Sequence, residues 1–446
     1  MSESITYQYA RPSQLRQAGG NEQLFLSQYS EIAKPEASCF FWGRLNEAFI
    51  TARCLLTLSK IVQSSFNLSP FQLAMLKDPI VTAGNKTLRF EGFSHCAGVY
   101  GRVDVLAAAQ DGEFPAAGTT NVDFNAPMLN ALARIRPKQS VVLSVGEKEV
   151  SLEQEGQKVI ERKVPLPTKW IKGLTTVQIF LAQTEPFFRF NRVQAQQLFR
   201  SLPKGNPKQD YYLSQRGSRP LFSPMKQAKA VCVGGVHRLR LLEPLLPLAQ
   251  SLEVYAQPEM QATTWVLSFG AVRFTMSLSR ETWRGFSGEG AALESLVADV
   301  PQTWIERLDQ YSYANQTFNP TLLAIDENLN EAQLSQLTGR LAAMGLLGFD
   351  LHDNAYFYRR LPFKLDRILR LNPRMKNAEK LVAEGKVEIV ARSAAKIEAR
   401  VAGTDVKHTV IIEAERARCT CTWFSRHQGE RGPCKHILAV KKLLNG

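Results

Sequence analysis

Four residues near the end of this sequence have the types and the spacing of a metal site. Cys419 and Cys421 form a C-x-C pair, and after twelve intervening residues Cys434 and His436 form a C-x-H pair. Thiolate and imidazole groups are preferred ligands of Zn²⁺, and four of them complete its tetrahedral coordination. Side chains two residues apart on extended backbone point to the same side, so the C-x-C pair can bind one ion. The spacing therefore predicts a closed zinc site, which leaves no open position for a substrate.

The charge balance of this site favours deprotonated thiols. Three thiolates, a neutral imidazole and Zn²⁺ leave one net negative charge, and four basic residues lie nearby in the sequence. Because metal binding requires deprotonated ligands, we expect zinc binding to weaken in mild acid. His427 is the one competing ligand in the gap, and its polar neighbours favour an exposed loop histidine instead. The basic neighbours are Arg416, Arg418, Arg431 and Lys435.

The four residues resemble the SWIM-type zinc finger, whose pattern is C-x-C, a variable gap and C-x-H. The β-like residues before the motif, the aromatic pair Trp423 and Phe424, and an apolar helix beginning near Ile437 agree with this resemblance. It implies a small module that binds Zn²⁺ and then contacts DNA or proteins. Zn²⁺ is the cofactor that we expect.

Outside this motif, the sequence more loosely resembles bacterial SWIM-domain proteins of about this length. The segments that suggest it are 118–125, 356–363 and 372–374. That resemblance implies association with a MoxR-type AAA+ ATPase and a von Willebrand factor A protein. The residues alone indicate neither partner.

Positive charge is concentrated around the zinc motif. The net charge of the sequence is +14, and residues 359–446 contain 20 Lys and Arg against 9 Asp and Glu. Such a region can attract nucleic acid, an anionic membrane surface or an acidic protein. Cations beside aromatic rings can bind phosphate and stack bases, although a solvated basic surface has the same composition. The candidate nucleic-acid or partner contacts are Trp423, Phe424, Arg426, Arg431, Lys435, Lys441 and Lys442.

The elements that must position the motif form a predicted unit at 377–446. Gly385 ends its first helix, and the Gly432-Pro433 step favours a turn just before the C-x-H pair. Together these elements predict a small ββα-like zinc-binding module. The β-like runs are 387–390, 395–401 and 409–412, and helices are expected at 377–384 and 435–444.

The rest of the chain predicts a multidomain α+β protein. Residues 1–202 form an N-terminal α+β region, 203–218 an exposed linker, and 219–320 a mixed, largely β region. Residues 321–376 predict a helix and a hairpin, a winged-helix-like order that any small α+β unit also produces. Helical periodicity occurs at 45–66, 126–135, 186–202 and 330–344, and β-like runs at 87–105 and 140–165.

Composition places the chain among ordinary globular proteins. It has 44% hydrophobic and 22% charged residues, and its length suggests about two to four domains. We find no signal-peptide pattern and no apolar run of about 20 residues, and therefore expect a cytoplasmic protein. The other cysteines are scattered, as expected of buried apolar residues in a reducing compartment: Cys39, Cys54, Cys96 and Cys232.

The sequence lacks the common catalytic motifs. There is no phosphate-binding G-x-x-x-x-G-K-[ST], H-E-x-x-H, G-x-S-x-G or G-x-G-x-x-G, so we predict a protein that is not an enzyme. The main hypothesis is a zinc-binding adaptor that docks a protein partner in an AAA+ ATPase-type system. The alternative is a DNA- or RNA-binding protein that uses its basic zinc module. The partner, the oligomeric state and the role of residues 1–320 stay open.

Overall fold

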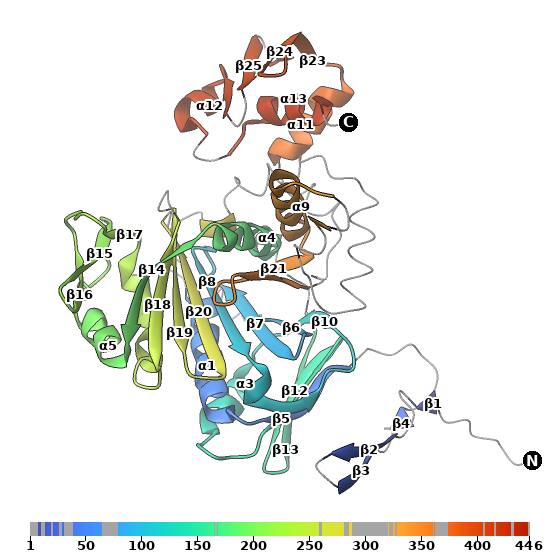
Figure 1. Cartoon of the computed structure of the whole chain (residues 1–446), viewed down its shortest axis with the longest axis vertical. Helices are drawn as coiled ribbons and strands as arrows, with labels where there is room; N and C mark the ends of the chain where they lie inside the picture. Colours follow the sequence, from blue (N-terminus) through green and yellow to red (C-terminus); the bar gives the residue numbers. More distant parts are fainter. Residues whose placement is uncertain are drawn as a thin grey trace, which may run out of the picture. The chain divides into compact units, whose positions relative to one another are not determined.

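A computed structural model gives the fold of the chain (Figure 1). The chain forms two compact units, Met1–Ser38 and Cys39–Gly446. In the first, β1 (Gln8–Tyr9) pairs with β4 (Tyr29–Ser30), and β2 (Gln14–Ala18) pairs with β3 (Asn21–Phe25), both antiparallel. The structure describes residues 8–9, 14–18, 21–25, 29–30, 39–64, 79–164, 166, 168–257, 261–280, 285–287, 320, 324–325, 328–359, 361, 373–404, 406–413, 416–429 and 432–444.

The centre of the second unit is an eight-stranded sheet, called the main sheet. Its strand order is β10-β6-β7-β8-β20-β19-β18-β14, and every neighbouring pair is antiparallel. The strands are β6 (Ile80–Gly84), β7 (Thr87–Phe93), β8 (Val99–Val105), β10 (Gly118–Asn121), β14 (Glu185–Asn191), β18 (Ser251–Ala256), β19 (Ala262–Ser268) and β20 (Val272–Ser279).

Two smaller sheets accompany the main sheet. One has the order β13-β12-β11-β5-β9 and the other β16-β15-β17. Their strands are β5 (Cys39–Leu45), β9 (Gln110–Glu113), β11 (Val142–Gly146), β12 (Glu149–Gln154), β13 (Gln157–Arg162), β15 (Tyr211–Arg216), β16 (Arg219–Ser223) and β17 (Val231–Val233).

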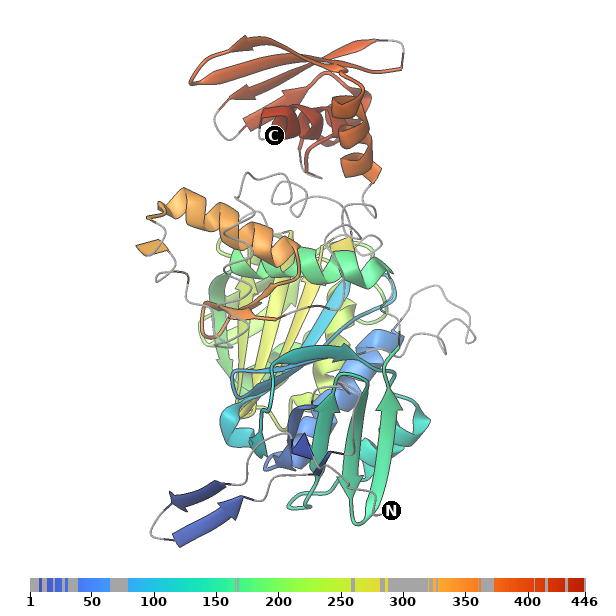
Figure 2. The same ribbon diagram turned by 90° about the vertical axis from the view of Figure 1, so that its right-hand side faces the viewer.

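The helices cover both faces of the main sheet. Helix α1 and the 3₁₀ helix η2 contact each other in one hydrophobic core, and α4 and α9 contact each other in a second core (Figure 2). None of the described helices is long and apolar enough to cross a membrane. The helices of these layers are α1 (Ala48–Gln63), α3 (Ala126–Arg134), α4 (Thr168–Ala182), α5 (Arg192–Arg200), α9 (Glu331–Ala343) and η2 (Val236–Leu245), with short 3₁₀ turns η1 (Ala107–Ala109) and η3 (Gly285–Ser287).

The hairpin after α9 docks on a charged face of the main sheet. It consists of β21 (Leu347–Asp350) and β22 (Ala355–Tyr358). Arg359 Nη1 donates to both carboxylate oxygens of Glu91 on β7, at 2.7 and 2.6 Å, and both side chains are fully buried. Arg102 Nη1 on β8 donates to the carbonyl oxygen of Phe349 at 2.7 Å. The helix and hairpin predicted within 321–376 are therefore present, but they share a core with α4 and the sheet.

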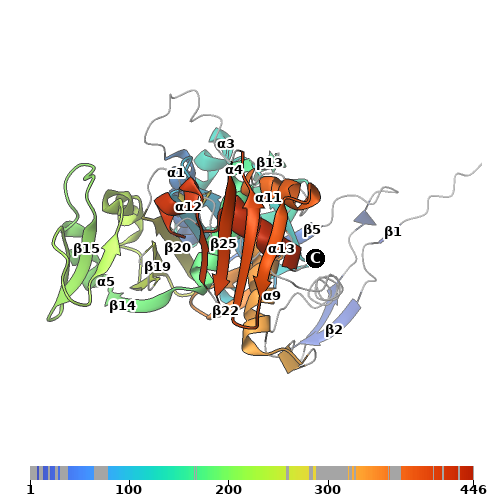
Figure 3. The same cartoon turned by 90° about the horizontal axis from the view of Figure 1, so that it is seen from above.

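The last described residues, 373–444, form the C-terminal module. Four antiparallel strands in the order β23-β24-β25-β26 pack against α11 and α13 through buried residues such as Val401, Val410 and Val440. Figure 3 shows α12 and α11 at opposite sides of this sheet. The module thus has four strands, one more than the three predicted β-like runs, because β26 pairs with β25. Its elements are α11 (Pro373–Ala383), β23 (Val387–Arg392), β24 (Lys396–Ala402), β25 (Lys407–Glu413), β26 (Arg416–Cys419), α12 (Thr422–His427) and α13 (Lys435–Leu444).

The helix predicted at 186–202 is wrong in its first half. Glu185–Asn191 is strand β14, because it pairs with β18 at the edge of the main sheet. Helix α5 begins after Asn191, whose Oδ1 accepts the Gln194 N–H at 2.9 Å, while the Gln194 side chain accepts the Asn191 N–H at 3.1 Å. This capping box places the helix start where tertiary strand pairing ends.

The linker expected at 203–218 is a loop only as far as residue 210. Tyr211–Arg216 is β15, which pairs with both β16 and β17. The main sheet also takes strands from both of the regions predicted at 1–202 and 219–320, so that boundary does not divide it. Helix α4 was not predicted from the sequence, because its Thr, Ile and Val residues have modest helix propensity. Packing against α9 compensates for this propensity in the folded chain.

Candidate metal centre

The four predicted ligands come from adjoining elements of the C-terminal module. Strand β26 ends at Cys419, and Cys421 is the N-cap of α12 with extended backbone, φ −74° and ψ 151°. The Phe424 N–H donates to Cys421 Sγ at 3.4 Å, as expected of an N-cap side chain. Cys434 directly precedes α13, whose first turn contains His436. The strand end and the two helix starts therefore converge on one point.

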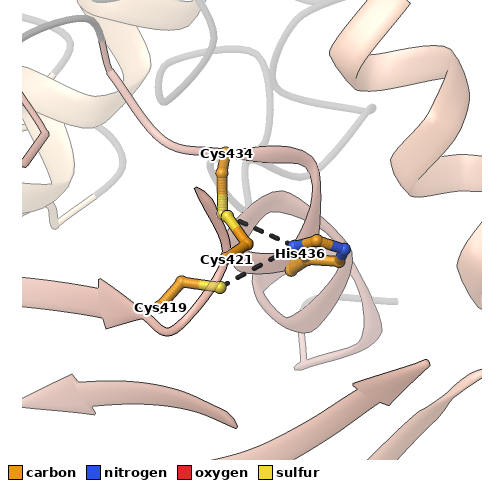
Figure 4. A group of neighbouring side chains, drawn as sticks. All are labelled: Cys419, Cys421, Cys434 and His436. Atoms are coloured by element: carbon orange, nitrogen blue, oxygen red, sulfur yellow. Dashed lines mark hydrogen bonds between the residues drawn. The ribbon is translucent and has the colours of Figure 1, made fainter. Parts of the chain in front are cut away.

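The ligand atoms have the spacing of a tetrahedral zinc site (Figure 4). All four lie within 4.8 Å of one another, and all four residues are buried. His436 Nδ1 lies 3.7 Å from Cys419 Sγ and 4.0 Å from Cys434 Sγ. With Zn–S near 2.3 Å and Zn–N near 2.0 Å, tetrahedral sulfur and nitrogen ligands stand about 3.6 Å apart. The side chains thus fit Zn²⁺, with Cys419, Cys421, Cys434 and His436 as its ligands.

The three thiols of the site differ in pKa. A hydrogen bond between the sulfurs of Cys419 and Cys434 raises the pKa of Cys419, which burial raises further. The same bond lowers the pKa of Cys434 to about 4, against the effect of burial and with help from His436. Burial raises the pKa of Cys421. Because Zn²⁺ binds thiolates, its binding displaces the protons of the thiols whose pKa values are raised, Cys419 and Cys421.

The ligand histidine has a defined orientation. Since Nδ1 faces the sulfurs, Nε2 of His436 points away from them, and it is buried without a hydrogen-bond partner among the described residues. The ring of His408 lies against it, with centroids 4.5 Å apart. Burial, and then the neighbouring His436, lower the pKa of His408. His408 is outside the ligand cluster, and its ring packs against the ring of the ligand His436.

Arg374 contacts the loop just before the C-x-H pair and was not among the predicted site residues. Its Nη1 donates to the carbonyl oxygen of Pro433 at 2.8 Å, and its guanidinium carbon lies 4.5 Å from the ring centroid of Trp423. One side chain of α11 thereby joins the C-x-H loop to α12. The partners are far apart in sequence, so no local spacing indicates this contact.

The predicted contact residues fall into different surroundings. Trp423 and Phe424 are partly buried against the core of the module. Lys442 Nζ donates to Glu379 at 2.6 Å, whereas Arg426 is exposed. Lys435 and Lys441 are half-buried on α13, and Arg431 lies outside the described residues.

His427 is not part of the ligand cluster. It ends α12, half-buried, and its ring meets Trp423 edge-on with centroids 4.8 Å apart. The loop expected between the two ligand pairs therefore contains a short helix. His427 is a packing residue of that helix.

Residues 408–445 match the family model of the SWIM zinc finger. The C-terminal module carries a SWIM zinc finger. The match begins in β25 and includes the four ligands, so it confirms the resemblance for this module and Zn²⁺ as its metal. It covers less than half of the chain, and no curated protein matches the chain.

Solved structures similar to this chain include two of low sequence identity. One is the PCNA2–PCNA3 complex from Sulfolobus tokodaii, with 9% identity and a TM-score of 0.40, covering 54% of this chain and 99% of that chain. The other is the Proliferating Cellular Nuclear Antigen from Entamoeba histolytica, with 9% identity and a TM-score of 0.36 at the same coverages. Similarity at this level carries no argument about this chain.

Proposed function

We propose that the chain is a non-enzymatic binding protein whose SWIM finger docks a protein partner. The observation that carries this proposal is the closed, buried set of four protein ligands around one point. A catalytic zinc keeps one position for water or substrate, whereas a closed set stabilises structure. The metal therefore serves to hold the surface of the module in shape.

Contacts on the module favour a protein partner over nucleic acid. The ring of Trp423 is in contact with Arg374 and His427, so base stacking there would require these contacts to break. Several lysines of the module are paired with its own carboxylates: Lys396 with Glu413, Lys407 with Glu388 and Lys442 with Glu379. Phosphates would have to compete with those carboxylates.

DNA or RNA binding is the second candidate function. It is favoured by the basic excess of residues 359–446 and by the exposed side chain of Arg426. A docking role beside a MoxR-type AAA+ ATPase or a von Willebrand factor A protein is a narrower form of the first proposal. It rests on the family resemblance alone.

A salt series separates the two functions. Zinc-loaded protein and its Cys421→Ser variant are titrated with labelled DNA and RNA from low to physiological salt. Nucleic-acid contacts release counterions, so their affinity falls steeply with salt, and we expect no tight binding that depends on the finger. Tight, salt-sensitive binding lost in Cys421→Ser would overturn the protein-docking proposal in favour of the second candidate.

A further inference from the structure

Strand β26 lies at an edge of the module sheet. Among the described strands it pairs only with β25. The Thr420 N–H donates to the carbonyl oxygen of Thr409 at 3.1 Å. Antiparallel ladders alternate residue by residue, so the peptide groups of Arg418 face β25 while those of Ala417 face the opposite side. Such an edge is a template for one more strand.

A groove of about 860 Å³ runs along this edge. Its lining includes all of β26, with Thr409 and Ile411 of the neighbouring strand β25. Phe424, Pro433 and the almost fully buried Ile437 contribute apolar side chains to the same lining. The groove therefore combines an edge strand with apolar side chains, the two features by which a domain binds an extended peptide.

Two arginines give this groove a positive rim. Arg416 and Arg418 both line it and both are exposed. No carboxylate of the described residues forms an ion pair with either side chain, whereas the cations of the adjoining strands, Lys396 and Lys407, are paired. Because residues two apart on a strand point to the same side, the two guanidinium groups point the same way.

We propose that an extended acidic segment of a partner protein binds this groove as a fifth strand beside β26. Its backbone pairs with the peptide groups of Ala417, and carboxylates at alternate positions pair with Arg416 and Arg418. The proposal rests on the protein-docking function above and specifies the chemistry of the partner. Single-stranded nucleic acid would need a stacking ring, and Phe424 is partly buried in the module core.

The first test is peptide selection on the full-length, zinc-loaded chain. A random-peptide display library is selected on the wild type and on Arg416→Glu/Arg418→Glu. We expect peptides with Asp or Glu at alternate positions from the wild type, and Lys or Arg at those positions from the variant. The matched control, Arg392→Glu/Arg400→Glu, changes the charge equally on the same sheet but outside the groove lining, and should select the wild-type peptides.

Affinity measurements follow with one selected peptide and an oligothymidylate. The Arg416→Glu/Arg418→Glu variant should bind the peptide about tenfold more weakly, since exposed ion pairs contribute little each and charge reversal adds repulsion. The control variant should bind it as the wild type does. Zinc content measured on all three proteins excludes loss of the finger as the cause.

The backbone contact has its own readout. With nitrogen-labelled alanine, the bound peptide should slow hydrogen exchange at the Ala417 amide, which faces the groove. The Ala399 amide, in a central strand, should not change. An acidic peptide that binds without slowing Ala417 would refute strand addition.

The outcomes separate this inference from the function that it rests on. If no acidic peptides are selected, or if the control variant loses the peptide equally, the groove proposal is wrong. If only the oligothymidylate binds, and its binding requires Arg416 and Arg418, both proposals are wrong and the module is a nucleic-acid-binding module. If a partner protein binds Arg416→Glu/Arg418→Glu as it binds the wild type but does not bind Cys421→Ser, the protein-docking function is supported and the groove proposal is wrong.

Discussion

The Cys421→Ser substitution should unfold the C-terminal module and leave the body, described residues 39–361, intact. Cys421 contributes both a ligand sulfur and the N-cap of α12, so the change removes a metal bond and loosens the start of a helix. The core of the module shares no residue with the two cores of the body. The loss is therefore expected to stay local.

The small core of the module determines how much stability the module keeps without zinc. A single core in a unit of about 70 residues rarely contributes more than about 3–5 kcal/mol. Structural zinc contributes about 10–16 kcal/mol in small fingers at neutral pH. In the variant, the buried side chains of Cys419, Cys434 and His436 lack their bonds to the metal, which costs about 1–3 kcal/mol for each unsatisfied group. The core alone does not exceed that cost, so the metal-free module should be unfolded.

Hydrogen exchange followed by mass spectrometry measures this directly. Peptides covering β24 and β25 should lose protection in Cys421→Ser, and peptides covering β7 and β8 should keep it. Cys96→Ser is the matched control, since that cysteine is half-buried in a loop of the body. Loss of protection in β7 and β8 would refute a separable module. Unchanged protection in β24 and β25 would refute the dependence of the fold on zinc.

Three further predictions concern the body and the finger. Arg359→Met should destabilise the body by about 3–5 kcal/mol in a denaturant titration, because it leaves Glu91 buried without its ion partner. Adding Glu91→Gln to this variant should recover part of the lost stability. No recovery in the double variant would contradict the argument that the two side chains stabilise the body as a pair. Burial raises the pKa of Glu91, but Arg359 and the hydrogen bond from Tyr100 lower it overall. The pair therefore stabilises the body fully above about pH 4.3, the pKa of a glutamate in the unfolded chain. This stabilisation should be lost as the pH falls through the lower pKa of Glu91 in the folded chain. Identical acid titrations of the wild type and Arg359→Met, followed by circular dichroism, would contradict this. His427→Ala should leave zinc content unchanged in metal analysis, whereas loss of zinc would make His427 a ligand.

The zinc ligands could be predicted from the sequence because their chemistry is local. Cys419 with Cys421, and Cys434 with His436, each lie two residues apart, and each pair sits on one short piece of backbone. Helix ends were readable for the same reason: Gly345, with φ +80°, directly follows the C-cap of α9, in a conformation that other residues rarely adopt. Such signals require only neighbouring residues.

Pairing between distant segments decided the rest. Glu185–Asn191 is a strand because β18 lies beside it, and the charged residues Glu91 and Arg359 are buried because the hairpin brings one to the other. Arg374 reaches Trp423 only through the packing of α11 in the module. The sequence by itself thus determined which residues bind the metal. Only the tertiary structure decided what surrounds them, because burial and the groove beside β26 arise from chain segments that meet only after folding.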